Sequence, residues 1–398
     1  MMRAQRMPGA WWIEPRLRGL LVLLALLSAP VAAAEEPPAE KAATKKPSPF
    51  RDPEDGAIDV SGWLASRTGV LPIPVPITEP AVGYGGALAL VKFQGGGLAG
   101  ALKAPPGPSG KPIPPDIAAV GGGLTENGTW AVFAGYIGHF KEDRWRYKGA
   151  IARLAPTLDY YGSNDKAYAF TMDGWAVYQE VGRRVGKTDF FAGVQLAYVD
   201  STVSFDLPQL PPEIPLPELG MTESGAGPFV EWDTRNNSLT PSSGFNVKAS
   251  AMFLGPWLGG DNAFERYTGT AKVYWDPKPR LVFAARLQAQ GVSGEAPFYA
   301  LPFVYFRGIP VMRYQGDTAA SVDGEVRWNV WKRWWAVAFA GAGRTADAPG
   351  FSKEGESVHA GGLGFRYLIA RRLGLQAGLD VAKGPEEYAI YVVAGSSF

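Results

Sequence analysis

Apolar and polar residues alternate one by one through several segments of the C-terminal half of the chain. This is the period of a β-strand with two unlike faces. In GEVRWNV, Glu325 and Arg327 share one face while Trp328 lies on the other, and LVFAARLQAQ, GGLGFRYL and LGLQAGLDV repeat the pattern. No segment after the first thirty residues approaches the ~18 unbroken apolar residues of a spanning helix. The alternation therefore predicts an all-β chain.

The first residues have the form of a signal peptide. Four arginines precede the apolar run 20–27, and Ala32 and Ala34 fit the A-x-A cleavage pattern. We expect a signal peptide at residues 1–34; the alternative is a membrane anchor, but the run is short for a spanning helix of ~20 residues. Cleavage leaves the chain close to neutral, which gives no reason to expect a nucleic-acid partner.

The composition favours a transmembrane β-barrel over a soluble sheet. The chain holds 50 glycines, 13 tryptophans and no cysteine. Glycine, aromatic residues and alternation at moderate polarity are typical of barrels in lipid, although a large soluble β-sandwich also alternates. The tryptophans near strand ends suit interfacial girdles, and these are Trp175, Trp232, Trp275, Trp328, Trp334 and Trp335.

The predicted domain order starts with the signal peptide and a disordered periplasmic linker at 35–56, which is rich in Pro, Ala, Lys and Glu. The proline-containing segment 57–80 is expected to lead into the barrel in extended form or to act as a plug. Strands and turns alternate over 81–398, which we assign to the barrel. The pattern gives 15 strands there, and because single-chain bacterial barrels have even numbers we expect about 16.

The last expected strand, YAIYVVAGSSF, alternates through Tyr388, Ile390 and Val392 and ends on Phe398. A terminal aromatic residue closing an alternating strand resembles the sorting signal of outer-membrane barrels. The predicted location is therefore the bacterial outer membrane. The predicted partners are its lipid and, during biogenesis, the outer-membrane assembly machinery.

One turn carries a family resemblance. In EWDTRNNSLTPSSGF, Asp233 and Arg235 lie two residues apart and can pair, while Pro241 and Gly244 belong to the turn. The pattern resembles the turn signature of the bacterial surface antigen barrels, the BamA/TamA-like outer-membrane assembly superfamily. The resemblance covers roughly residues 55–398.

The same resemblance extends to FRGIP, residues 306–310, which looks like the Arg-Gly motif of the long extracellular loop that folds into the lumen in this family. It implies that Arg307 and Gly308 form a loop-to-lumen lock with Glu325 and Asp380, both on expected lumen faces. The chain departs from the family in two residues. Ile309 stands where an aromatic residue is frequent, and Ala340 stands where an acid is frequent.

The segment before the barrel leaves no room for the soluble periplasmic modules of the insertases, so the chain resembles the branch that lacks them. A barrel aiding the insertion or translocation of client proteins, or perturbing lipid, is the first functional hypothesis. A passive or loop-plugged pore is the alternative. We expect no enzyme, cofactor or metal site, because only His139 and His359 exist, no G-x-S-x-G motif is present, and no ligand spacing is evident.

Overall fold

The structure is a computed structural model that describes residues 48, 50–67, 69–95, 100, 105–162, 166–206, 218–348 and 354–398. The chain divides into two units, Met1–Lys46 and Pro47–Phe398, and the described residues all belong to the second. The predicted signal peptide at 1–34 and the linker as far as residue 47 lie outside the described residues.

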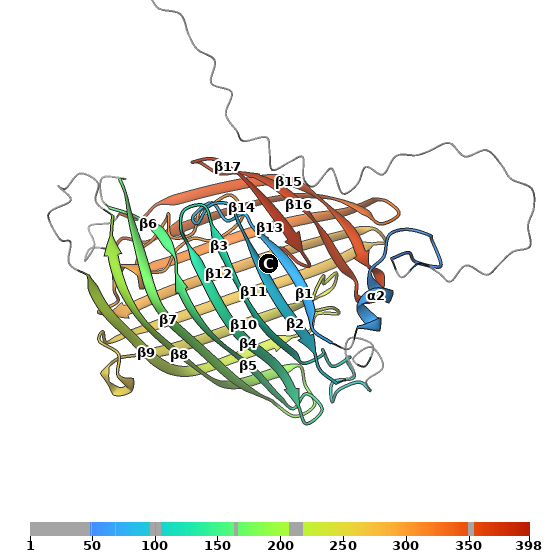
Figure 1. Cartoon of the computed structure of the whole chain (residues 1–398), viewed down its shortest axis with the longest axis horizontal. Helices are drawn as coiled ribbons and strands as arrows, with labels where there is room; N and C mark the ends of the chain where they lie inside the picture. The colour runs from blue at the N-terminus through green and yellow to red at the C-terminus, as the bar shows by residue number, and fades with distance from the viewer. Residues whose placement is uncertain are drawn as a thin grey trace, which may run out of the picture. The chain divides into compact units, whose positions relative to one another are not determined.

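The second unit is an antiparallel β-barrel (Figure 1). Its strands are β1 Leu71–Ile77, β2 Gly85–Phe93, β3 Ile117–Thr125, β4 Trp130–Phe140, β5 Trp145–Ala155, β6 Thr157–Tyr161, β7 Ala167–Arg184, β8 Phe190–Phe205, β9 Leu219–Asp233, β10 Gly244–Leu254, β11 Phe264–Lys278, β12 Leu281–Gly294, β13 Thr318–Trp331, β14 Trp334–Thr345, β15 Ser357–Ala370, β16 Leu375–Lys383 and β17 Tyr388–Ala394. The short helices are α2 Ser61–Ser66, η2 Pro256–Leu258, η3 Phe298–Ala300 and η5 Arg371–Leu373.

β5 and β6 are two parts of one strand. Both pair with β7, and Pro156, which has no N–H to give to a ladder, separates them. The barrel therefore has 16 strands, which confirms the predicted number.

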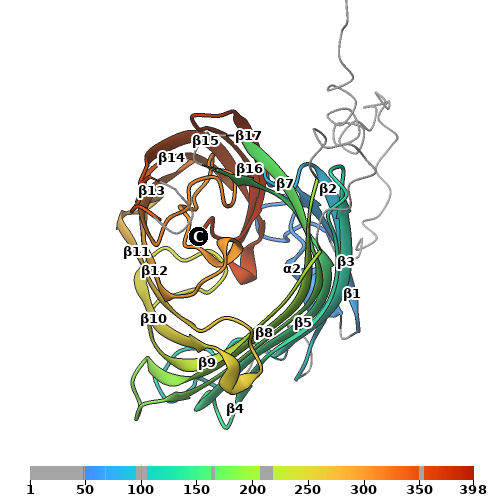
Figure 2. The same ribbon diagram turned by 90° about the vertical axis from the view of Figure 1, so that its left-hand side faces the viewer.

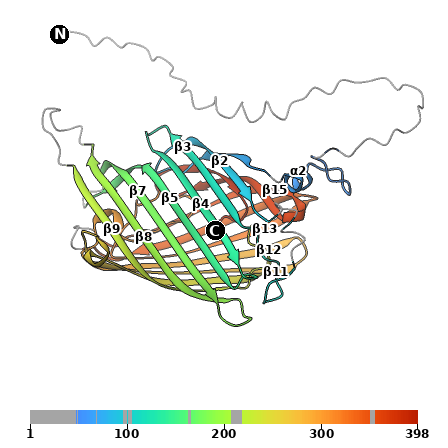
Figure 3. The same cartoon turned by 60° about the horizontal axis from the view of Figure 1, so that its bottom comes forward.

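The strands form a meander in which each pairs antiparallel with the next (Figures 2 and 3). Turns at 279–280 and 332–333 join their strands at one end, which we assign to the periplasm, and the longer connection 295–317 lies at the other end. Among the described residues no ladder joins β17 to β1. We call the line between these two strands the seam.

The alternation places the two faces as predicted. Ladder partners share a face, so the lumen face can be followed from Glu325 to Phe339, Gly362 and Ala382. Trp328, on the opposite face, is 58 % exposed, as expected for a residue facing lipid. In the described part of the chain, no helix has the length and apolar character needed to cross a bilayer.

The strand missing from the sequence-based count is β1. Residues 71–77 pair with β2 from Leu71 opposite Val91 to Ile77 opposite Gly85, so their assignment to a lead-in segment or plug is wrong. The reason is that Pro72, Pro74 and Pro76 make the segment read as a non-strand. Proline is tolerated in a sheet at an edge, and β1 is such an edge strand.

The assignment of residues 50–56 to a disordered linker is also wrong. Arg333, in the β13–β14 turn, lies 2.6 Å from Asp52, 2.7 Å from Asp55 and 2.7 Å from Asp59. Arg371 pairs with Asp52 at 2.8 Å. These charges tie the N-terminal segment and α2 to the periplasmic ends of β13–β16 (Figure 1).

The end of the chain differs from the prediction as well. β17 stops at Ala394, and Gly395 turns the backbone at φ +86°. Phe398 then stacks on the lumen-facing Tyr274, with ring centroids 6.2 Å apart, rather than closing the alternating strand. Tyr388, Ile390 and Val392 are exposed on the outer face; their sorting role stays a prediction.

Candidate functional site

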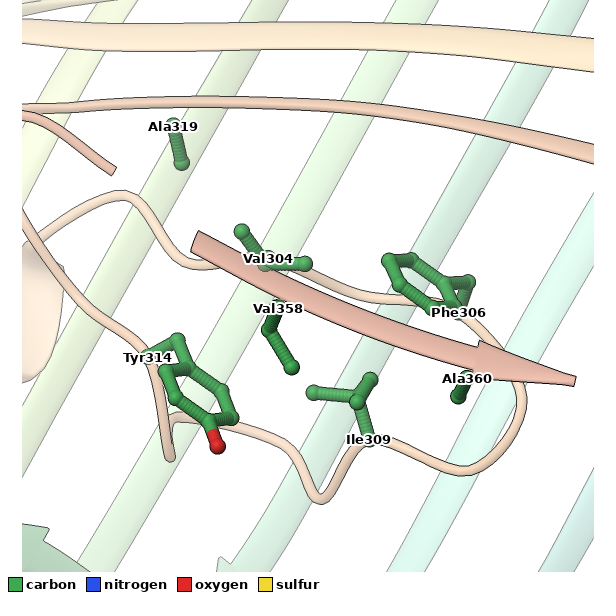
Figure 4. Close-up of a cluster of buried hydrophobic side chains, with 7 residues drawn as sticks. All are labelled: Val304, Phe306, Ile309, Tyr314, Ala319, Val358 and Ala360. Carbon is green, nitrogen blue, oxygen red and sulfur yellow. The ribbon is translucent and has the colours of Figure 1, made fainter. Parts of the chain in front are cut away.

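The connection 295–317 folds into the lumen and packs there against the wall built by β13 and β15. Val304, Phe306, Ile309 and Tyr314 from the loop form a buried cluster with Ala319, Val358 and Ala360 from the strands (Figure 4). Ile309 is fully buried, so it fills the place where the family resemblance led us to expect an aromatic side chain. The cluster fixes the loop segment that carries the arginine.

Arg307 reaches two acidic side chains on the lumen wall. Its Nη2 atom lies 2.7 Å from Oε2 of Glu325 on β13, and its Nη1 atom donates to Oδ2 of Asp380 on β16 at 2.5 Å. The guanidinium also lies 3.6 Å from the ring centroid of Phe339. The structure thus brings together Arg307, Glu325 and Asp380, which the sequence had placed on three separate segments.

Further groups complete this ion cluster, and the sequence reasoning missed them. Arg366 donates to both oxygens of Asp380 at 2.6 and 2.8 Å, and Nε of Arg327 lies 3.4 Å from Oε1 of Glu325. The Ser397 hydroxyl donates to Glu325 at 2.9 Å and accepts from Arg307 at 3.2 Å. Arg366 could have been found as a lumen-face residue of GGLGFRYL, but nothing in the sequence indicates that Ser397 turns inward.

Gly308 is required by its surroundings. Its φ is +94°, and a Cβ atom there would lie 2.9 Å from Cβ of Ala360 and 3.3 Å from Cβ of Ala382. Its N–H donates to the Tyr391 hydroxyl of β17 at 2.9 Å. Glycine therefore allows the backbone of the loop to lie against β15–β17.

A second contact links the loop to the first hairpin. The carboxyl group of Glu79, in the β1–β2 turn, accepts a hydrogen bond from the backbone N–H of Val311. Burial raises the pKa of Glu79 to about 7. The loop therefore contacts both strands that border the seam, through Tyr391 of β17 and through the turn that follows β1.

The two histidines lie on different strands, His139 on β4 and His359 on β15. His139 Nδ1 lies 3.3 Å from Asp116, and His359 is exposed on the outer face of β15. Among the described residues no group of three His, Cys, Asp or Glu side chains is arranged to hold a metal ion.

Comparison with known proteins gives one family. Residues 222–304, which span β9 to the first half of the inserted loop, match the Omp85 superfamily domain. The family match is confined to this segment of the barrel. No curated protein matches the chain's sequence.

Solved structures share the fold at low identity. The BamA structure from Haemophilus ducreyi that lacks POTRA domains 1–3 aligns with a TM-score of 0.56 and 12 % identity, over 83 % of this chain and 70 % of that one. CdiB from Escherichia coli aligns with a TM-score of 0.54 and 11 % identity, over 81 % of this chain and 62 % of that one. The chain thus spans less than two thirds of CdiB. In the described residues before β1 the only helix is α2.

The segment that matches the Omp85 superfamily domain includes the β9–β10 turn. Asp233 and Arg235 pair at 2.7 Å, as their spacing suggests. At Gly244, φ is +92° and a Cβ atom would lie 2.5 Å from the carbonyl oxygen of Thr234. Pro241 is buried, and its carbonyl oxygen accepts from Arg327 on the lumen wall.

The same turn reaches the end of the chain. Leu239 accepts a hydrogen bond from the N–H of Ser396 at 2.6 Å, and Thr240 accepts from the N–H of Gln376. The tail 395–398 therefore contacts the β9–β10 turn through Ser396 and the inserted loop through Ser397. Sequence spacing predicted the local pair but not this role as a support.

Proposed function

We propose that this barrel perturbs the outer membrane at its seam and thereby aids the passage of lipid. The observation that carries the proposal is the missing ladder between β17 and β1. A barrel is stable in lipid because closure leaves no unpaired backbone groups. A seam without a ladder therefore exposes backbone polar groups to the bilayer and thins or disorders the lipid beside it.

The chemistry of β1 explains why the seam is unpaired. In the β1–β2 ladder, Leu71, Ile73, Val75 and Ile77 alternate with the three prolines. Successive residues of a strand direct their N–H groups to opposite sides. The positions directed at the seam are thus Pro72, Pro74 and Pro76, which have no N–H to donate.

This edge also bears on the choice between lipid and protein as the cargo. A client strand that added to β1 would find carbonyl acceptors but no donors at three successive positions. Strand addition depends on main-chain hydrogen bonds for its affinity. The proline edge therefore favours a role toward lipid over one in which β1 templates a client strand.

The inserted loop argues against a passive pore. Its backbone is bound to neighbouring strands, with Arg266 of β11 donating to the Ala300 carbonyl at 2.7 Å and Gln290 of β12 to that of Phe303 at 3.4 Å. We propose that Arg307, Gly308, Glu325 and Asp380 act as the lock that keeps this loop in the lumen. A barrel occupied in this way conducts poorly unless the loop moves.

The experiment compares lipid scrambling in liposomes that contain the wild-type barrel or a variant with Pro72→Thr, Pro74→Thr and Pro76→Thr. Threonine favours strands and returns three donors to the seam, so we expect the variant to scramble a fluorescent phospholipid at least tenfold more slowly. A control with Leu88→Thr and Leu90→Thr changes the outer face of the adjacent strand β2 but leaves the prolines.

Three outcomes would overturn the proposal. If liposomes that contain the wild-type barrel scramble the phospholipid no faster than protein-free liposomes, the barrel does not aid the passage of lipid. Faster folding of a second, unrelated barrel by both the wild type and the threonine variant, without scrambling, replaces it by a role in protein insertion. Conductance that appears in Arg307→Ala but not in the wild type would identify a loop-plugged pore.

A further inference from the structure

The lumen face of the first four strands is apolar. Following the ladders from Glu180 on β7 through Lys148, Ile137, Ile117 and Phe93 identifies which side chains point inward. The inward residues of β1–β4 are the odd-numbered positions of 71–77, 85–93, 117–125 and 131–139. We call this surface the apolar inner wall.

The apolar inner wall differs from the rest of the lumen. It carries no Lys, Arg, Asp or Glu, and its two polar members, Thr125 and His139, lie at strand ends. The lumen face of β12–β16 carries the ion cluster around Arg307 together with Arg286, which pairs with Asp323 at 2.8 Å. A barrel lumen is ordinarily polar, so an apolar sector calls for an apolar occupant.

Large side chains of this wall are open within the part of the chain that the structure describes. Ile73 is 38 % exposed, Val75 42 %, Phe133 38 % and Ile137 40 %. Contiguous exposed apolar surface of this kind marks a binding site rather than a solvated face. The small residues Ala87, Ala89 and Ala119 between them leave room for a ligand.

The wall begins at the seam. β1 carries both its first inward residues and the proline edge, so a molecule leaving the bilayer through the seam meets this surface first. On the outer face of the neighbouring strands a hollow of about 490 Å³ is lined by apolar and polar side chains, among them Leu90, Lys92 and Tyr136. This places apolar surface and one cation on the membrane side of the same strands.

We propose that the apolar inner wall binds an acyl chain of a phospholipid that enters through the seam. The entry route rests on the proposed function; the binding surface does not. The absence of charge on the wall disfavours a polar solute, and the missing donors on β1 disfavour a protein strand. An acyl chain needs neither partner and gains ~0.8 kcal/mol for each CH₂ group that it buries.

The test uses single cysteines, since the chain has none of its own. Ala89→Cys labels the apolar inner wall, its neighbour Leu88→Cys labels the outer face, and Thr270→Cys labels the charged side of the lumen on β11. Each variant carries bimane and is reconstituted in phosphatidylcholine liposomes whose acyl chains are brominated. Iodide is the matched quencher from water.

We expect bromolipid to quench the label at position 89 to at least half the extent seen at position 88, and to leave position 270 unchanged. Iodide should quench position 270 most strongly. Quenching of the label at position 89 by iodide alone would mean that water, and not lipid, covers the wall, and would overturn the proposal. Quenching by neither reagent would mean that another part of this chain covers the wall, and would overturn it too.

The entry route is tested separately by combining Ala89→Cys with the three proline-to-threonine substitutions. If lipid enters through the seam, bromolipid quenching at position 89 falls at least threefold in this background; unchanged quenching overturns the route. If bromolipid quenches the label at position 89 but the wild-type barrel does not scramble phospholipid, the binding site stands and the proposed function is rejected. The two failures are therefore distinguishable.

Discussion

Nη2 of Arg307 lies 2.7 Å from Oε2 of Glu325, and both side chains are almost completely buried in the lumen. A buried charge that loses its partner is costly, because the low-dielectric surroundings no longer compensate it. Here the pair joins a loop to a strand on the wall. Its loss should therefore affect loop position as well as stability.

Arg307→Ala should destabilise the barrel by about 3 kcal/mol, at the low end for breaking a buried pair. The low end applies because Arg366 still pairs with Asp380 and Arg327 still lies near Glu325. Urea unfolding in detergent micelles measures the free energy, and protease digestion of intact cells or liposomes measures access to 295–317.

The matched control is Arg344→Ala, which removes an exposed arginine of the same barrel. It should change the free energy of unfolding by no more than about 0.5 kcal/mol and leave the cleavage of the loop as in the wild type. An Arg307→Ala barrel with wild-type stability and an equally protected loop would contradict the assigned lock.

Gly308→Ala should cost about 3 kcal/mol. Part of this is the left-handed backbone, which costs an L-residue about 1–2 kcal/mol, and part is the approach of the new Cβ to Ala360 at 2.9 Å. Gly128→Ala separates the two, because Gly128 has φ +90° and nothing within 4 Å of its Cβ position. Thermal unfolding followed by gel mobility compares the variants, and equal losses would show that crowding against β15 is absent.

Acid should release the N-terminal segment. Although burial alone would raise it, hydrogen bonds from Ser61, Arg371 and Arg333 hold the pKa of Asp59 below its usual value. The docked carboxylate therefore contributes above the ordinary Asp pKa of about 4, and that contribution is lost as the pH falls through the lower docked value.

A spin label on Ser66→Cys should accordingly be immobile at pH 7 and become mobile as the pH falls below the ordinary Asp pKa of about 4. Arg333→Ala should make it mobile at pH 7, since all three aspartates lose their shared partner. A label that stays immobile in Arg333→Ala would mean that the charges do not hold the segment.

Glu79→Gln should stabilise the barrel at pH 8 but not at pH 5. The folded pKa of about 7 exceeds the ordinary Glu value, so the unfolded chain loses its proton first as the pH rises. Wild-type stability therefore falls between about pH 4.5 and 7, by up to about 3 kcal/mol at this shift. The difference in unfolding free energy between wild type and Glu79→Gln, measured at both pH values, isolates this group. A constant difference would contradict the assigned burial.

The predictable part of the fold depended on local pattern. Period-2 alternation located 15 strands and assigned Glu325, Arg327 and Asp380 to the lumen, because side-chain direction in a strand follows from sequence position alone. Family resemblance in FRGIP then singled out Arg307. The same local logic failed at LPIPVPI, since proline is excluded from paired interiors and only an edge position, which is not visible locally, makes it acceptable.

The sequence by itself therefore determined the strand faces, the barrel class and the candidate partners of Arg307. Only the tertiary structure decided that three aspartates tie residues 50–59 to Arg333 and that Ser397 and Phe398 turn into the lumen. It also decided that an apolar wall begins at an unpaired seam. These contacts join residues between 72 and 281 positions apart, and they are set by barrel closure and loop folding rather than by the preferences of neighbouring residues.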